Sequence, residues 1–420
     1  MSTERQSIVA KHIEEILTKL KCKPQGCAKN PYLDAVWGDH PYKTVLWGWD
    51  AYFIALRLAA KGEPQWLKYH TDNFLEFQNP KTGFIPQMHP LFSEVNLEQA
   101  DTYYPLMAQG IWIYGTLSND TQWVQRAVGG ARRLLRYYET YQQDECGLFF
   151  NRFSWSGVDN DAATAFLRPG LVCSPWINSF LWLEYRALAR IGRMLGDASL
   201  ELESSVKGDK LKHGMERLMW SEEDSCYAPY NRETRESTIR MKDARLNAQG
   251  IGLCSFLSFT NVMPLYAGLA DPARAKQVIE KYVLSPDHFF SRWGIRSLSK
   301  ASEYYGNAVW GNPPRFESPE RLTNSNWQGP VWVPCTYFLF RALLNYGYAD
   351  AAASVTENIT ETLAADIEQN GMMHENYDAE TGQPLYAKNF ASWNVLADLM
   401  PGELETRESV CDLFIDKPGS

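Results

Sequence analysis

The stretch SWSGVDND, residues 154–161, places two carboxylates beside a pair of aromatic side chains. Asp159 and Asp161 close the stretch, while Phe153 and Trp155 stand at its start. A turn rich in Asp, Asn and Gly would account for this pattern without any function. A carboxyl group next to apolar rings is hard to ionise, however, so an Asp here can keep a proton near neutral pH and donate it to a reacting group.

Two further stretches join a carboxylate to aromatic residues. HENYDAETGQP (374–384) places Glu375 after the apolar run GMM, whereas its later part, DAETG, has the form of a surface turn. WGWD (47–50) places Asp50 before an apolar segment, where Asp is also a favoured helix N-cap. NSNWQGPVW (324–332) adds two Trp and several amides, although a helix start with a Gly-Pro cap gives the same pattern.

Other catalytic classes lack their signatures. The chain has no GxSxG, P-loop or GxGxxG motif, and its seven His show no HxxxH or HExxH spacing. We therefore expect no metal and no cofactor. Paired carboxylates remain, and they suit hydrolysis of a glycosidic bond, in which an inverting enzyme holds an acid and a base roughly 6.5–9.5 Å apart with a water between them.

Composition agrees with a sugar ligand and argues against several partners. Of 420 residues, 13% are aromatic, including 15 Trp, and such rings stack on the C–H faces of sugars. A net charge of −9 without Lys or Arg clusters argues against nucleic acid. No signal peptide or membrane span is recognised, and the eight scattered Cys read as reduced and mostly buried, so we expect a cytoplasmic protein. The oligomeric state stays open, with a homo-oligomer as one form.

Helical periodicity dominates the chain. Six segments are apolar almost all round, at residues 48–60, 102–115, 174–192, 250–269, 329–347 and 389–400. One-sided amphipathic helices lie between them, at about 5–21, 64–78, 121–142, 207–220, 272–284 and 352–367. Because all-round apolar helices are buried and one-sided helices face water, the alternation predicts an all-α (α/α)6 barrel of six inner and six outer helices.

We expect residues 1–420 to form one catalytic domain, because no linker-like stretch divides the chain. The N-terminal helix would belong to the outer ring, and residues 402–420 would be a peripheral tail. Long loops at 79–101, 143–172 and 286–328 exceed ordinary connectors, which indicates a functional role. In such a barrel they would gather over one end, where a binding site is expected.

WGWDAYF, SGVDND, LTNSNWQGPVW and HENYDAETG followed by NFASWN resemble the motifs of inverting glycosidases on an (α/α)6 barrel. The similarity runs from about residue 30 to 400 and is strongest to glycoside hydrolase family 63, especially its small mannosylglycerate and glucosylglycerate hydrolases. The chain departs from the family where Trp-Ser precedes Gly157, and where Gln328 stands in place of Arg.

The resemblance implies roles for individual residues. Asp159 matches the general acid and Glu375 the general base, while Asp50 matches an acid that holds sugar hydroxyls. The expected substrate-binding residues are Asp50, Trp47, Tyr52, Gln87, His89, Gln109, Asn160, Trp327, Gln328, Trp332, Tyr377 and Trp393, with Asn389 at the rim. A glycerate carboxylate would need a cation, for which the loops offer Lys43, His89, Arg168, Arg292 and Arg315.

The implied activity is hydrolysis of a small α-linked substrate, first of all glucosylglycerate or mannosylglycerate, to hexose and glycerate. An α-glucosidase acting on short oligosaccharides or disaccharides is the alternative. A non-catalytic sugar-binding barrel is a more remote one, because both candidate catalytic carboxylates are present. A polysaccharide lyase or a zinc prenyltransferase-like enzyme agrees less well with an acidic chain that lacks metal-ligand spacing.

Overall fold

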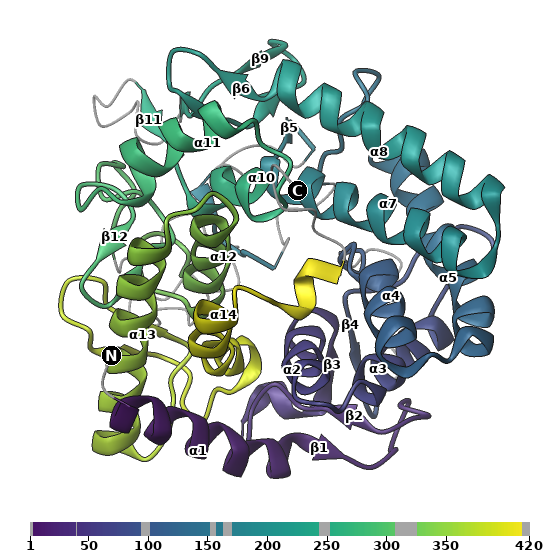
Figure 1. Cartoon of the computed structure of the whole chain (residues 1–420), viewed down its shortest axis with the longest axis horizontal. Helices are drawn as coiled ribbons and strands as arrows, with labels where there is room; N and C mark the ends of the chain where they lie inside the picture. Colours follow the sequence, from purple (N-terminus) through teal and green to yellow (C-terminus); the bar gives the residue numbers. More distant parts are fainter. Residues whose placement is uncertain are drawn as a thin grey trace.

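Helices form two concentric rings about a common axis (Figure 1). The computed structural model describes residues 3–38, 40–93, 101–151, 157–162, 170–242, 253–306 and 326–413. The inner ring consists of α2 (Gly48–Ala60), α4 (Met107–Ser118), α7 (Pro175–Leu195), α10 (Met263–Tyr266), α12 (Val333–Asn345) and the 3-10 helix η5 (Ser392–Asp398). Each packs on the next, and η5 packs back on α2, so the inner ring is closed.

The outer ring surrounds the inner one (Figure 1). It consists of α1 (Thr3–Leu20), α3 (Gln65–Glu76), α5 (Thr121–Tyr141), α8 (Ala198–Leu218), α11 (Pro272–Val278) with its π-helical extension η3 (Ile279–Val283), and α13 (Ala349–Asn370). α1 packs on α13, which brings the first and last outer helices together. The predicted (α/α)6 barrel is confirmed.

Short helical turns and two-residue or three-residue strands connect the rings. The turns are η1 (Pro41–Thr44), η2 (Phe259–Val262), α14 (Met400–Thr406) and η6 (Val410–Leu413). The antiparallel strand pairs are β1 (Lys21–Cys22) with β2 (Tyr32–Leu33), β3 (Val45–Trp47) with β4 (Met88–Pro90), β6 (Trp220–Ser221) with β7 (Cys226–Tyr227), β10 (Arg240–Met241) with β11 (Cys254–Ser255), β12 (Phe290–Ser291) with β13 (Gly294–Ile295), and β14 (Asn376–Tyr377) with β15 (Pro384–Leu385). β5 (Val172–Cys173), β8 (Tyr230–Asn231) and β9 (Glu236–Ser237) form a small sheet.

Local sequence signals set the ends of the long helices. The Asp120 side chain accepts a hydrogen bond from the Trp123 amide at the start of α5, which satisfies a donor that the helix itself cannot. Asp197 does the same for Leu200 at the start of α8. Gly196 ends α7 in the left-handed conformation, with φ of 69°, which glycine adopts without steric cost.

Two inner segments are not the continuous helices that their apolar composition predicts. Within 250–269, the described residues form β11, η2 and a single turn of α10, because Ser258 and Asn261 build a capping box and start a new helix at Phe259. Within 389–400, Asn389 and Ser392 have φ of 57° and 23°, which an α-helix excludes, so the helix there is the short η5.

Part of the C-terminal tail, expected to be peripheral, packs on the barrel, since Glu403 and Cys411 are buried, while residues 405–408 are exposed. Arg341 of α12 is 1% exposed and bonds to Glu403 at 3.3 Å and to Asp412. Tyr337 donates a hydrogen bond of 2.9 Å to Glu403, and Cys411 is fully buried. The segment η6 packs on α2 and α4, and Figure 1 shows it, in yellow, crossing the middle of the ring.

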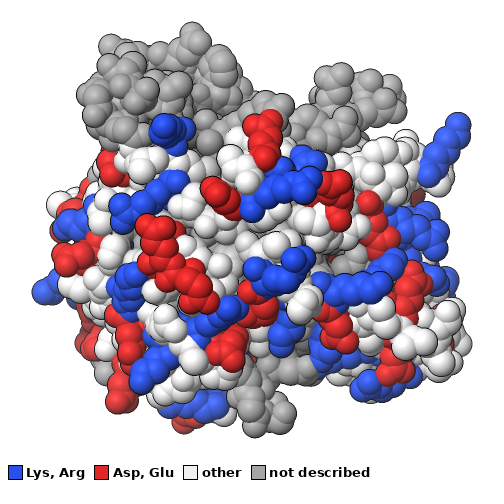
Figure 2. Space-filling view, turned by 90° about the horizontal axis from the view of Figure 1, so that it is seen from above, with Lys and Arg blue, Asp and Glu red and all other residues white. Residues whose placement is uncertain are grey.

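Charges of both signs are interspersed on the face of Figure 2, and over its described residues neither sign gathers into one large patch. All eight Cys lie in the described ranges, none forms a disulfide there, and five of them are buried. The described helices include none that is long and apolar enough to cross a membrane. Within the same ranges, no group of three or more His, Cys, Asp or Glu could hold a metal ion.

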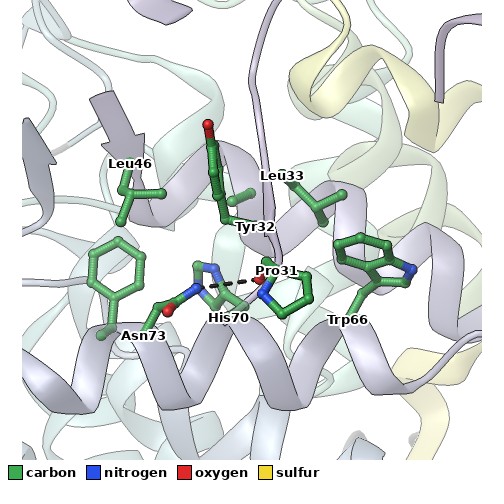
Figure 3. A pocket seen from close by; sticks show the side chains of 9 residues that line it. Pro31, Tyr32, Leu33, Leu46, Trp66, His70 and Asn73 are labelled. Atoms are coloured by element: carbon green, nitrogen blue, oxygen red, sulfur yellow. Dashed lines mark hydrogen bonds between the residues drawn. The ribbon is translucent and has the colours of Figure 1, made fainter. Parts of the chain in front are cut away.

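A small apolar cavity lies between the inner helix α2 and the outer helix α3 (Figure 3). Its volume is about 10 Å³, which suffices for one water at most. Its lining consists of Pro31, Tyr32, Leu33, Leu46, Ala51, Trp66, His70, Asn73 and Phe74. Asn73 Nδ2 donates to the Pro31 carbonyl at 3.3 Å, so α3 holds the segment that leads into β2.

A buried ion pair joins the first and last inner helices. Arg57 of α2 is 2% exposed and donates to Asp398 of η5 from Nε at 3.0 Å and from Nη2 at 2.6 Å. Nη2 also bonds to Glu14 of α1. One guanidinium therefore links three segments at the point where both rings close.

Arg57→Ala should lower the free energy of unfolding by about 3 kcal/mol, because it leaves the buried Asp398 carboxylate with only the exposed Lys61 ammonium, 3.5 Å away, as its charged partner. Urea denaturation monitored by circular dichroism measures the change. Arg193→Ala is the matched control, since Arg193 pairs with Glu201 at an exposed position, where such pairs contribute at most about 1 kcal/mol. Equal losses in the two variants would show that ring closure does not depend on this ion pair.

Candidate active site

A cavity of about 90 Å³ lies at the N-terminal end of α2. Carboxylates and aromatic rings dominate its described lining, with one amide. The lining residues are Tyr42, Trp47, Trp49, Asp50, Gln87, Gly157, Asp159, Glu375, Phe390 and Trp393. The fold therefore brings six residues selected from the sequence to one place, namely Trp47, Asp50, Gln87, Asp159, Glu375 and Trp393.

Asp50 lies in the first turn of α2 but is not its N-cap. The N-cap is Trp47, whose side chain makes no capping bond. The Asp50 carboxylate accepts a hydrogen bond of 2.6 Å from Ser392 Oγ. Burial raises the pKa of Asp50 to about 7, an effect that the Ser392 bond opposes and the nearby Asp159 charge increases. Asp50 is therefore poised to change its charge near neutral pH.

The strand pair β3–β4 places Trp47 and Gln87 beside the cavity. Trp47 pairs with Met88, and the Gly48 amide donates to the Gln87 carbonyl at 2.8 Å. A Cβ on Gly48 would lie 2.8 Å from that carbonyl oxygen and 2.8 Å from the Tyr103 ring. The glycine of WGWD thus allows the start of α2 to approach the strand that carries Gln87.

Asp159 occupies a tight turn, residues 157–162. Gly157 has φ of 75°, and a Cβ there would lie 3.1 Å from the Tyr104 ring. The Asp161 amide donates to the Val158 carbonyl at 2.9 Å. Asp161, the neighbouring acid, is 1% exposed and so is not the solvated turn residue that its setting suggested.

Asn160 fastens this turn to the segment that precedes α12. Its Oδ1 accepts from the Trp327 amide at 2.6 Å, and its carbonyl accepts from Gln328 Nε2 at 2.9 Å. Its Nδ2 donates to Asn326 at 3.3 Å. Asn160 and Gln328 are fully buried, so they hold the turn in place and do not line the cavity.

Three indoles stand behind the cavity. Trp327 and Trp332 stack with centroids 3.9 Å apart and planes 8° apart, and both are buried. Trp393 packs against them at 6.0 and 5.7 Å and itself lines the cavity. Trp327 and Trp332, which the sequence assigned to the cavity wall, therefore support this wall from behind. Trp393 forms part of the cavity surface itself.

Glu375 is 2% exposed and precedes the hairpin β14–β15. Among the described residues, none offers a hydrogen-bond partner to its buried Oε2 atom. Burial raises the pKa of Glu375 well above its ordinary value, and the charges of Asp50 and Asp159 raise it further. A carboxylate held this way accepts a proton readily.

Asp366 of α13 anchors the residues on either side of Glu375. It accepts hydrogen bonds from the His374 amide at 3.0 Å, from His374 Nδ1 at 2.9 Å and from the Tyr377 hydroxyl at 2.8 Å. Sequence reasoning missed Asp366, because it lies on an amphipathic helix with no motif around it. The Tyr377 side chain is fully buried, with its hydroxyl bonded to Asp366, and does not line the cavity.

A short bridge connects the acid turn to this hairpin. The Val331 amide donates to the Tyr377 carbonyl at 2.8 Å, and the Tyr377 amide donates back at 3.0 Å. Residues 326–331 thus bond to Asn160 at one end and to Tyr377 at the other. The positions of Asp159 and Glu375 are coupled through one stretch of backbone.

Asp159 influences three other carboxyl groups, those of Asp50, Asp101 and Glu375. Burial raises the pKa of Asp101 to about 8, and the Asp159 charge adds to that shift. The same charge raises the pKa values of Asp50 and Glu375. Since like charges in a dry site oppose one another, these carboxyl groups cannot all ionise independently.

Several residues expected to bind substrate bond to or pack on other parts of the protein and do not line the described cavity. Gln109 is buried and donates to Glu184, which also accepts from the Ala108 and Gln109 amides and so caps α4. His89 stacks on Phe77 at 4.0 Å. Tyr52 is buried against Phe53. Asn389, with φ of 57°, bonds to Trp37 through its carbonyl at 3.2 Å rather than lining the cavity.

Of the candidate cations, those that the structure describes do not line the cavity. Lys43 is exposed and its charge acts on Asp34 and Cys22. Arg292 is exposed and lies over the Trp293 ring, 5.3 Å from its centroid. Arg168 and Arg315 lie outside the described residues.

Trp49, Tyr42 and Phe390 line the cavity but were not selected from the sequence. A signal for Trp49 was present, since it precedes Asp50 in the first turn of α2. Its Nε1 is buried and, within the described ranges, has no hydrogen-bond partner, and the same holds for Trp393 Nε1. The lining thus offers donors and acceptors that a hydroxylated ligand could satisfy.

The later part of HENYDAETGQP, residues 378–382, is a surface turn, as its sequence indicated. Asp378 Oδ1 accepts from the amides of Glu380 and Thr381 at 2.9 and 2.8 Å. Glu380 pairs with Arg296 and Lys300, and these bonds lower its pKa to about 2. Of the acids in this stretch, Glu375 alone lines the described cavity.

Comparison with known proteins gives consistent matches. A family model for the mannosylglycerate hydrolase MGH1-like glycoside hydrolase domain matches residues 42–393. Mannosyl-oligosaccharide glucosidase of Saccharomyces cerevisiae is 22% identical over 316 residues, which is 68% of this chain and 34% of that protein. A probable mannosyl-oligosaccharide glucosidase of Schizosaccharomyces pombe is 24% identical over 300 residues, 63% and 33% of the two chains. The chain spans about a third of the length of these curated relatives.

Solved structures share the fold over nearly the whole chain. The GH63 mannosylglycerate hydrolase from Thermus thermophilus, in complex with Tris and D-glycerate, superposes with a TM-score of 0.69 at 17% identity. The match covers 94% of this chain and 100% of that one. Its glucose complex gives a TM-score of 0.66 at 18% identity, covering 93% and 99%. At this identity the likeness concerns the fold.

Gly48→Ala should lower the free energy of unfolding by about 1–3 kcal/mol, because the added methyl group would overlap the Gln87 carbonyl and the Tyr103 ring. Thermal unfolding monitored by circular dichroism measures the change. Gly402→Ala in α14 is the control, since a Cβ there meets no atom within 4 Å and alanine favours a helix. A Gly48→Ala variant as stable as the control would contradict the close approach of α2 and the Gln87 strand.

Proposed function

The chain belongs to the mannosylglycerate hydrolase-like glycoside hydrolases of glycoside hydrolase family 63, and from that membership we propose that it hydrolyses a small α-linked glycoside with inversion. One observation supports the activity above the others. Asp159 and Glu375 come from distant parts of the sequence and line the same aromatic cavity. An inverting glycosidase needs such a pair, one carboxyl group to protonate the leaving oxygen and one carboxylate to activate water.

Asp159 is the proposed general acid. It donates its proton to the glycosidic oxygen as the bond to the anomeric carbon breaks. Asn160 and Gly157 fix the turn that carries it, so the carboxyl group meets the bond in a defined orientation. Asp50, held by Ser392, lies in the same lining and is the proposed acceptor for hydroxyl groups of the sugar.

Glu375 is the proposed general base. It takes a proton from the water that attacks the anomeric carbon, and its raised pKa makes the ionised form a strong proton acceptor. A proton on Asp159 removes one of the two charges that oppose ionisation of Glu375, the other being that of Asp50. The state that catalysis needs, with a neutral acid and an ionised base, is therefore one in which the two groups do not repel each other.

A hexosylglycerate, glucosylglycerate or mannosylglycerate, is the proposed substrate. The solved relative with the same fold is a mannosylglycerate hydrolase in complex with D-glycerate, and this chain covers that protein almost completely. The glycerate carboxylate needs a cation, and Arg168 and Arg315 are the proposed sources, since neither Lys43 nor Arg292 lines the described cavity.

An α-glucosidase of short oligosaccharides is the second candidate, and one observation favours it. The described lining holds three carboxylates and neither Lys, Arg nor His, which suits a neutral sugar better than an anionic one. Two relatives carry the name mannosyl-oligosaccharide glucosidase, which places their substrate among the oligosaccharides.

The deciding experiment offers the purified protein glucosylglycerate, mannosylglycerate, trehalose, nigerose and kojibiose and measures the released hexose. A preference for a hexosylglycerate of at least about tenfold in kcat/KM is expected, and Arg168→Ala and Arg315→Ala should reduce it. Preference for a neutral disaccharide would establish the second candidate. Proton NMR of the first product should show the β-anomer, because water attacks the face opposite the leaving group. The α-anomer would exclude inversion.

Asp159→Asn and Glu375→Gln should each reduce kcat by about 100-fold to 10,000-fold, because each removes a proton-transfer group while keeping its shape. Initial rates with the best substrate of the screen measure this loss. Glu380→Gln is the matched control, since it makes the same change in the same stretch at an ion-paired, half-exposed position and should leave kcat unchanged. Retention of full activity by either cavity variant would remove that residue from the mechanism.

A further inference from the structure

Ser392 makes a direct contact with a carboxylate of the cavity. Its side chain is fully buried, and its Oγ donates to Asp50 Oδ1 at 2.6 Å. A hydrogen bond to a charged group is short and strong, and it restricts the rotation of the carboxylate that accepts it. The contact joins η5 to the first turn of α2, two elements that pack on each other.

The backbone at Ser392 takes an unusual conformation to make this contact. Its φ of 23° lies in the left-handed region, which glycine occupies more easily than any other residue. The amides of Ala391 and Ser392 both donate to the Ala35 carbonyl, at 3.1 and 2.8 Å, and so hold the segment in place. A position whose backbone conformation would suit glycine is therefore occupied by a serine, and the serine hydroxyl donates a hydrogen bond to the Asp50 carboxylate.

The same segment also supports the proposed base and the aromatic wall. Asn394 Nδ2 donates to the His374 carbonyl at 2.8 Å, directly before Glu375. The Phe390 amide donates to the Met373 carbonyl at 3.0 Å, and Phe390 itself lines the cavity. Ser392 is therefore fixed relative to the groups that surround Asp50.

The groups that act electrostatically on Asp50 are few. The Asp159 charge raises its pKa, and Asp50 in turn raises the pKa of Glu375. On elements packed against α2, Asp398 of η5 pairs with Arg57, Asp412 of η6 bonds to Arg341, and His70 of α3 bonds to the Tyr103 hydroxyl at 2.7 Å. The Ser392 hydroxyl opposes the effect of burial and favours the ionised carboxylate.

We propose that Ser392 is a positioning residue of the site, whose hydroxyl favours the ionised form of the Asp50 carboxylate and orients it toward the sugar hydroxyls. The inference rests on the proposed function for its effect on turnover, but the contact itself is independent of any substrate. Ser392 touches no reacting atom in this scheme and acts through Asp50 alone.

Kinetics and a direct titration test the proposal in Ser392→Ala and Ser392→Gly. Alanine removes the hydroxyl, and glycine removes it while relieving the left-handed backbone. Both should raise KM by about tenfold or more, the effect of losing a hydrogen bond to a charged group. Both should also move the acid limb of the kcat/KM profile to higher pH, because Asp50 then holds its proton longer. Ser392→Thr keeps the hydroxyl, so its KM and its kcat/KM profile should lie closer to those of the parent than the values of either other variant.

Ser354→Ala is the matched control, since Ser354 is exposed on α13 and bonds only to the Asp350 carbonyl among the described residues. Parent-like KM and pH profile in both hydroxyl-free variants would overturn the proposal. A loss in alanine that glycine restores would also overturn it, because strain and not the hydroxyl would then be the cause.

A carbon-13 NMR titration of Asp-labelled protein provides a readout that needs no activity. Asp50 is assigned by comparison with Asp50→Asn, and its pKa should rise in Ser392→Ala relative to the parent. An unchanged Asp50 pKa would refute the positioning role even if the enzyme hydrolyses its substrate. A raised pKa in a protein that hydrolyses none of the tested glycosides would uphold the contact and refute the proposed function instead.

Discussion

The geometry of the site depends on one hydrogen-bonded stretch, residues 326–331, that spans the two loops carrying its acids. Asn160 bonds to Trp327 and Gln328 at one end, and Tyr377 bonds to Val331 at the other. Neither Asp159 nor Glu375 belongs to a helix of the inner ring, so the barrel alone cannot fix the distance between their carboxyl groups. A glycosidase that inverts needs a defined gap for one water, and a continuous backbone link is a stiff way to set it.

Electrostatic repulsion is the second constraint on this cavity. Burial and mutual proximity raise the pKa values of Asp50, Asp101 and Glu375, and Asp159 contributes to all three. In a family 63 glycosidase this arrangement has a use, because protonation of one acid makes ionisation of its neighbours easier. Among the described residues, a hydroxyl group rather than a cation compensates the buried Asp50 carboxylate, since Ser392 Oγ donates to it.

Patterns in the sequence predicted the barrel because apolar and amphipathic helices alternate along it. α2 begins and ends where its composition indicated, at Gly48 and Ala60. Motifs with several polar residues beside aromatic rings led to Asp50, Asp159 and Glu375, which the fold brings together. The sequence did not show that Trp49 also faces the cavity, since only Trp47 and Asp50 of WGWD were selected, whereas the cavity lining includes both Trp47 and Trp49.

Residues that act through a distant partner could not be predicted. Asp366 supports Glu375 from an ordinary outer helix, and the need for it appears only once His374 and Tyr377 are placed. Gln109 was expected to bind substrate, but its side-chain amide donates a hydrogen bond to Glu184 of the next inner helix. The break at Ser392 was hidden because an apolar composition records burial and carries no information about φ.

The ring closes through residues that are far apart along the chain, which has a consequence for how the protein reaches its native state. Arg57 and Asp398 are separated by 341 positions, and η5, which carries part of the cavity wall, docks on α2 near the end of the sequence. Contacts of such long range form slowly and late. During synthesis, most of the barrel therefore leaves the ribosome before η5 does, and until η5 docks, the cavity lacks its last wall and α2 lacks one of its packing partners.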